Sequence, residues 1–107
     1  MLQTHVAVME KNRTFLQSFE TEPWECGWAS EGLWFLKVSD LTGTLDVTSE
    51  VSPDGRDWGP SQYSQSIFEN GLHSLATRDL GPWTRLRATL SGEHASVHLF
   101  LYLSLKG

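Results

Sequence analysis

Apolar and polar residues alternate with a period of two along much of this chain, whereas the spacing typical of helices is nearly absent. The clearest alternation covers residues 95–106. One face of this run is aliphatic and consists of Val97, Leu99, Leu101, Leu103 and Leu105. The opposite face holds His98, Phe100, Tyr102 and Ser104. A strand has this pattern when one face lies in an aliphatic core and the other is covered by aromatic side chains or by a neighbouring chain.

Shorter alternating runs predict the other strands. They cover residues 6–8, 15–19, 34–39, 45–52, 62–68, 72–77 and 85–91. Turn-forming residues separate them: glycine is available for a positive φ angle in residues 41–43 and 90–92, and residues 52–55 read Ser-Pro-Asp-Gly. Seven or eight short strands, spaced by about 8–12 residues, predict an all-β fold, either an antiparallel β-sandwich or a jelly-roll-like barrel.

The length of 107 residues fits one domain, because a second domain would have too little apolar material for a core of its own. We therefore expect residues 1–107 to form a single β-sandwich domain. Residues 1–10 are either part of that domain or an N-terminal arm or exchanged strand. Cys26 is the only cysteine, so stability has to come from the core or from self-association rather than from an internal disulfide.

Charge argues against two classes of partner. The formal net charge is −5, and the 8 lysines and arginines occur in no basic run. Nucleic acid and anionic membranes both require a concentration of positive charge, so we expect neither as a partner. The first residues lack the charged and apolar regions of a secretory signal, and the longest apolar stretch is too short to cross a bilayer. We accordingly expect no membrane anchor and no export by the general secretory route.

Candidate catalytic and metal sites are weak. His94 and His98 would share a face of a strand but lie about 13 Å apart at ~3.3 Å per residue, too far for one metal ion. Cys26 has no nucleophile signature around it and is expected to be a buried or half-buried structural thiol. An acidic loop is expected to be solvated, and it holds Glu20, Glu22, Glu25 and Glu31. We therefore predict no catalytic residue, no metal site, no cofactor and no enzymatic activity.

The tryptophans are better candidates for a function. Trp34 and Trp83 lie beside predicted strand starts, where packing in the core or at its rim is expected. Trp24, Trp28 and Trp58 lie in predicted loops. These three could contact a partner protein, pack within the chain, or stack on sugars, and the sequence leaves all three uses open.

Residues 34–106 resemble small β-sandwich head proteins of tailed bacteriophages in the order of their turns and strands. The resemblance rests on residues 34–55 with Trp58, on residues 79–87, and on the closing strand at residues 95–106. It implies a capsid decoration or cement protein, made in the host cytoplasm and placed on the capsid surface. Such a protein binds the major capsid protein or another virion protein and commonly forms a homotrimer.

The resemblance leaves the binding surface open. The first candidates are the N-terminal strand with Val6 and Val8, which could pair with a sheet edge of a neighbouring chain, and the loop with Trp24 and Trp28. Candidates for contacts within a trimer are Phe100 and Tyr102, on the aromatic side of the last strand. Trp58, in a predicted loop, is a further candidate for binding a partner. Two alternatives stay open: a head–tail or tail accessory protein, and a carbohydrate-binding β-sandwich module.

Overall fold

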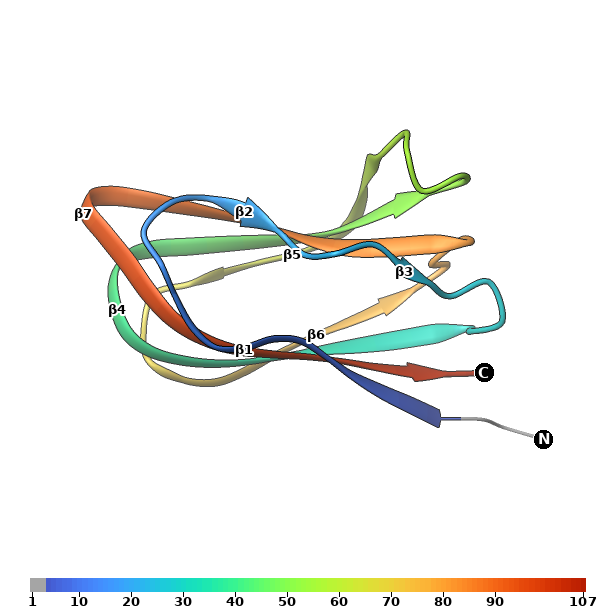
Figure 1. Ribbon diagram of the computed structural model, residues 1–107, viewed down its shortest axis with the longest axis horizontal. Coiled ribbons are helices and arrows are strands. Elements are labelled where there is room, and N and C mark those ends of the chain that lie inside the picture. Colours follow the sequence, from blue (N-terminus) through green and yellow to red (C-terminus); the bar gives the residue numbers. More distant parts are fainter. Residues whose placement is uncertain (1–3) are drawn as a thin grey trace.

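The computed structural model describes residues 4–107, with the side chains of residue 4 and of residues 6–11 outside the description. All regular secondary structure in this part of the chain is antiparallel β-strand, which confirms the predicted fold class (Figure 1). The strands are β1 (Thr4–Phe15), β2 (Phe19–Glu20), β3 (Trp24–Glu25), β4 (Glu31–Ser52), β5 (Gly59–Ile67), β6 (Gly71–Arg78) and β7 (Trp83–Lys106). Within residues 4–107 there is no helix long and apolar enough to span a membrane.

The two long strands, β4 and β7, pair with each other along both of their halves. Residues 31–39 of β4 pair with residues 98–106 of β7, and residues 44–52 of β4 pair with residues 83–91 of β7. The register between these halves shifts where both strands bend, and Figure 1 shows the two ribbons turning together at one end of the molecule. The bend folds one continuous sheet into two layers.

Each layer has its own additional strands. The first layer is formed by β1, residues 98–106 of β7, residues 31–39 of β4, and β6. The second layer contains β2 and β3, which pair with β7, and β5, which pairs with β4. The structure is therefore an open sheet folded into a sandwich.

The bends correct one detail of the sequence interpretation. The residues 41–43 and 90–92 separate alternating runs that we expected to be distinct short strands. In the structure they lie inside β4 and β7, where Gly43 and Gly92 adopt positive φ angles of 89° and 122°. Each glycine lies at a corner of a long strand. After the corner the same strand continues in the other layer.

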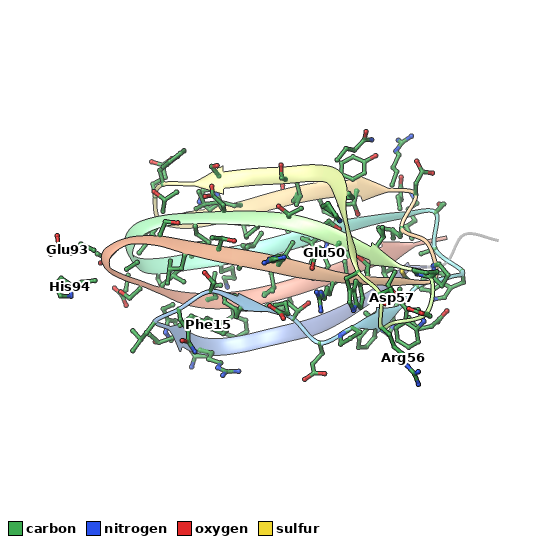
Figure 2. The ribbon with its side chains drawn as sticks, turned by 90° about the horizontal axis from the view of Figure 1, so that it is seen from above. Phe15, Glu50, Arg56, Asp57, Glu93 and His94 are labelled. Atoms are coloured by element: carbon green, nitrogen blue, oxygen red, sulfur yellow. The ribbon has the colours of Figure 1, made fainter. Side chains whose placement is uncertain are left out.

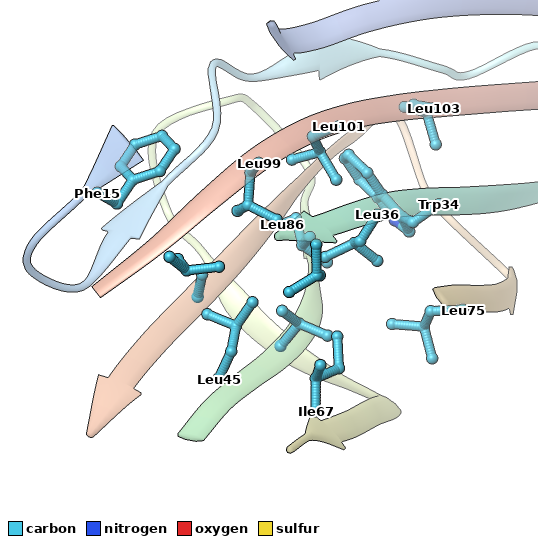
Figure 3. Packing of buried hydrophobic residues seen from close by; sticks show 14 of the residues in the cluster. Phe15, Trp34, Leu36, Leu45, Ile67, Leu75, Leu86, Leu99, Leu101 and Leu103 are labelled. Atoms are coloured by element: carbon cyan, nitrogen blue, oxygen red, sulfur yellow. The ribbon is translucent and has the colours of Figure 1, made fainter. Parts of the chain in front are cut away.

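The core lies between the layers and follows the predicted alternation. Leu99, Leu101, Leu103 and Leu105 are fully buried on the inner side of the first layer, beside Trp34 of the same layer, and they form one cluster with Leu45 and Leu86 of the second layer (Figure 3). Cys26 belongs to the same core, and its thiol donates a hydrogen bond to the carbonyl of Gly81 at 3.4 Å. Burial, together with the nearby carboxylate of Glu25, raises the pKa of Cys26 to about 11. This is the structural thiol that the sequence predicts.

The turn after β4 is organised by two side chains. The hydroxyl of Ser52 accepts hydrogen bonds from the amides of Asp54 and Gly55, and Asp54 Oδ1 accepts from the amides of Arg56 and Asp57. These backbone donors lower the pKa of Asp54 below its ordinary value. The turn chemistry expected for residues 52–55 is confirmed, and Gly55 has the positive φ angle, at 80°.

Candidate interaction surface

The outer face of the first layer carries a row of half-buried aromatic and aliphatic side chains. Phe35 of β4 pairs directly with Tyr102 of β7, so the two side chains share this face. The rings of Phe100 and Tyr102 stack with their centroids 5.5 Å apart and their planes at 17°. Leu33 lies two residues before Phe35 on the same face. We call these four residues, Leu33, Phe35, Phe100 and Tyr102, the aromatic face.

β1 borders the aromatic face. In its pairing with β7, the backbone of Val6 lies opposite Ser104 and that of Val8 opposite Tyr102. The side chains of Val6 and Val8 lie outside the described part of the structure. At the level of the backbone, the structure thus brings the predicted N-terminal strand beside Phe100 and Tyr102. In this arrangement β1 is paired within its own chain.

Charged side chains surround the aromatic face. At one end Glu31 lies 3.8 Å from Lys106 and 4.0 Å from Arg78, beside a hollow of about 370 Å³ floored by Leu33 and Ala76. Nearer the bend, the ammonium group of Lys37 lies over the ring of Phe100, 5.6 Å from its centroid.

A second hollow, of about 390 Å³, opens beside Phe100 and Leu72. His98 lies at its wall and joins β7 to β1, with its ring nitrogens 2.8 Å from Asn12 Oδ1 and 2.7 Å from Thr14 Oγ1. The aromatic face is therefore a shallow surface with a hollow towards each end.

The outer face of the second layer is different in kind. Its facing pairs on β4 and β7 are polar or charged, such as Glu50 with Arg85 and Thr48 with Arg87. Glu50 is buried and its Oε1 lies 2.8 Å from Arg85 Nε, while the Arg85 guanidinium covers the ring of Trp58 at 4.4 Å. The charges at the centre of this face are thus neutralised within the chain.

The structure separates the three loop tryptophans. The ring of Trp58 is covered by Arg85, and Trp24 packs against the core and stacks on His5 at 5.9 Å. Trp28 is the exposed one, with 41% of its surface accessible and Gly107 against its ring. Trp34 is fully buried, as expected for a residue beside a strand start. The three loop tryptophans therefore offer one exposed ring and two covered ones, and not a common platform.

Ionisable side chains are dispersed over the molecule. Figure 2 shows Glu93 and His94 at the bend, and Arg56 and Asp57 towards the other end. Among the side chains that the structure describes, no three His, Cys, Asp or Glu residues come close enough together to hold a metal ion.

Comparison with known proteins shows that the fold of this chain is similar to that of several solved structures. No protein-family model and no curated protein matches the chain. Its fold is similar to the crystal structure of the SPBc2 prophage-derived protein YomS, with a TM-score of 0.65 and 8% identity over 100% of this chain and 96% of that one. The PBSX exported protein XepA gives 0.63 and 11%, over 98% of this chain and 36% of that one. PirA gives 0.52 and 9%, over 97% and 93%. At these identities the likeness establishes the fold alone.

Sequence reasoning missed half of the aromatic face. It selected Phe100 and Tyr102 but not Leu33 and Phe35, although these alternate with the buried Trp34 in the sequence. Both faces of residues 33–38 carry apolar residues, and periodicity cannot tell which face of such a strand is turned inward. One signal was available in the sequence. Residues 33–38 and residues 95–106 both have large apolar residues on both faces, as expected for two strands that pair with each other.

Proposed function

We propose that this protein is a non-catalytic structural component of a tailed-phage particle, and specifically a decoration protein of the capsid surface. The observation that carries the proposal is the contrast between the two outer faces of the sandwich. The aromatic face presents the half-buried side chains of Leu33, Phe35, Phe100 and Tyr102, over which no element of residues 4–107 is layered, whereas the other face neutralises Glu50 and Arg85 against each other. A contiguous, partly exposed apolar surface with a polar rim is typical of protein–protein contact.

Two further observations support a phage context. Two of the solved structures with this fold are the SPBc2 prophage-derived protein YomS and the PBSX exported protein XepA. Independently, residues 34–106 resemble small virion proteins of tailed phages in their turns and strands.

The proposed mechanism is thermodynamic and involves no chemical step. A protein that binds the assembled capsid lattice, but not its dissociated subunits, stabilises the assembled state by mass action. Repetition of the contact over many equivalent lattice sites adds these contributions. Moderate affinity at each site is then sufficient to reinforce the shell.

A carbohydrate-binding module is less well supported. Sugar stacking requires exposed aromatic rings that share a plane. In this chain the ring of Trp58 is occupied by Arg85 and that of Trp24 by His5. Trp28 alone among the three loop tryptophans is strongly exposed.

The test is binding to particles. Purified protein is added to particles of the encoding phage from which its gene has been deleted, and binding is measured by co-sedimentation on separated heads and tails. We expect saturable binding to heads and a higher temperature of capsid disruption. Binding to tails alone would replace the decoration role with a tail accessory role, and binding to neither would overturn the virion proposal.

A matched pair of variants connects this binding to the surface. Tyr102→Ser removes a ring from the aromatic face, and Thr48→Ser makes a comparably exposed change on the other outer face. We expect the first variant to weaken binding by about tenfold or more, which corresponds to an interface residue worth ~1.4 kcal/mol. We expect the second variant to bind like the unchanged protein.

A further inference from the structure

The sandwich has four strand edges, because each of its two layers ends in an edge strand on either side. On one side the edges are β1 in the first layer and β2 with β3 in the second. On the other side they are β6 in the first layer and β5 in the second, and Figure 2 shows these two strands along one margin of the molecule. Edge strands direct unpaired backbone N–H and C=O groups outward, where another chain can pair with them.

Three of these four edges have features that hinder such pairing. The pairing of β1 with β7 contains two register shifts, one after Val8 and one after Glu10. The strands β2 and β3 have two residues each. The register of β5 on β4 shifts between Thr48 and Glu50, and the second residue of β5 is Pro60, which has no N–H group. Bulges, very short strands and prolines are the means by which strand edges avoid association.

β6 is the edge that lacks these features. Its eight residues, Gly71–Arg78, pair with residues 31–38 of β4 in one unbroken register. Within residues 4–107, β4 is its only partner strand. Alternate residues of an antiparallel edge strand turn their N–H and C=O groups away from the partner, so about half of the backbone groups of β6 point away from the sheet. The side chain of Leu72, near the start of β6, is 67% exposed.

The distribution of charge favours a second copy of this chain as the partner of β6. The protein has a net charge of −5, so most contacts between two copies would bring acidic groups together. Residues 59–77, which contain β5 and all but the last residue of β6, include a single Asp, Glu, Lys or Arg, namely Glu69. Two copies that meet along this side avoid the repulsion that the rest of the surface would cause. A neutral strand edge thus fits the same neutral edge of another copy.

We infer that β6 of one molecule pairs with β6 of a second copy, antiparallel and around a twofold axis, so that the first layer continues from one molecule into the other. An antiparallel strand pair is self-complementary under this symmetry. In the register centred on Leu75, Ser74 lies opposite Ala76 of the second copy, and Leu72 lies opposite Arg78 of the second copy. The aliphatic part of Arg78 then covers the exposed Leu72, and no side chain lies opposite a charge of the same sign.

The geometry of this pairing determines where the aromatic faces lie in the dimer. A twofold axis that relates two antiparallel strands of one sheet is perpendicular to that sheet, so the outer faces of both first layers point to the same side. The contact itself uses the edge of the layer and leaves Tyr102 free. Self-association and binding to a phage particle therefore depend on different residues, and either can fail without the other.

The experiment is light scattering after size exclusion on variants that place charges on β6. The unchanged protein should have a mass of twice 12.1 kDa at low salt and also at about 1 M salt, because a neutral contact is insensitive to screening. Ser74→Lys with Ala76→Lys places like charges opposite each other and should give single chains. Ser74→Lys with Ala76→Glu places opposite charges there and should remain a dimer at low salt. A register centred on Ser74 would instead bring the two lysines of the second variant together.

Controls separate the contact from net charge, from folding and from particle binding. Glu22→Lys changes the net charge as much as two added lysines do, on the opposite side of the sandwich, and should leave the mass unchanged. Tyr102→Ser should also remain a dimer. Each variant should retain the circular dichroism spectrum and cooperative thermal unfolding of the unchanged protein. Single chains or a mass of three chains for the unchanged protein, or equal masses for the two folded double variants, would overturn the pairing of β6 with β6.

Discussion

A Cβ atom added to Gly43 would lie 2.3 Å from the main-chain oxygen of Ser91. Gly43 is in the bend of β4, and Ser91 lies beside the corresponding bend of β7. The two long strands therefore turn from one layer to the other in backbone contact. This contact places the aromatic face on the first layer and the Glu50–Arg85 pair on the second, although the same two strands provide both.

We predict that Gly43→Ala lowers the free energy of unfolding by about 3 kcal/mol, because it combines the left-handed φ angle of 89° with a clash against fixed backbone. Chemical denaturation of the two proteins gives the difference. Gly71→Ala is the control, since Gly71 also has a positive φ angle but has open space around it. It should cost about 1–2 kcal/mol, from the φ angle alone. Equal losses in the two variants would mean that the close approach at Ser91 does not constrain the bend.

We predict that Glu50→Ala costs about 3 kcal/mol of unfolding free energy, because it leaves the mostly buried guanidinium of Arg85 without its carboxylate partner. Arg87→Ala removes the other cation near Glu50, which is largely exposed and 3.8 Å away. It should cost less than ~1 kcal/mol. Urea denaturation measures both values. A larger loss for the Arg87 variant than for the Glu50 variant would contradict the pairing.

The strand pattern was readable from the sequence where one face of a strand is uniformly aliphatic. The alternation of residues 95–106 predicts both the strand and its buried leucines, because a period of two follows from strand geometry alone. The bends at Gly43 and Gly92 were read as turns between strands, since a glycine in a polar stretch looks the same in a turn and in a strand corner. Only long-range pairing distinguishes the two.

The candidate surface was less predictable than the fold. Phe100 and Tyr102 stand out in sequence, but the pairing of Tyr102 with Phe35 depends on the register between two strands that are over sixty residues apart in the chain. Similarly, Trp58 looks like a free loop residue until Arg85, on another strand, is found to cover it. Pairings of this kind arise from tertiary structure, and they cannot be predicted from local sequence patterns.

The carboxylate of Asp54 gives a pH dependence of stability. Hydrogen bonds from the amides of Asp57 and Arg56 lower its pKa from the ordinary value of 3.8 in the folded protein. A depressed folded pKa contributes stability that is present above the unfolded value and is lost as the pH falls through the folded value. The stability difference between the unchanged protein and Asp54→Asn should thus be constant above about pH 5 and shrink below pH 3.8. Thermal unfolding from pH 7 to pH 2 measures this, and a difference that grows on acidification would show that the sign is wrong.

The buried thiol of Cys26 should be nearly inert in the folded protein. With a pKa of about 11, it is ionised to only about one part in a thousand at pH 8, and the thiolate is the reactive form. The core also covers the sulfur, so a thiol reagent has to wait for a local opening of the segment around β3. We predict that an aromatic disulfide reagent labels the native protein at least a hundredfold more slowly than the protein in denaturant, where the thiol regains an ordinary pKa of about 8.5. Labelling of the native protein at the rate of the denatured chain would place Cys26 outside the core.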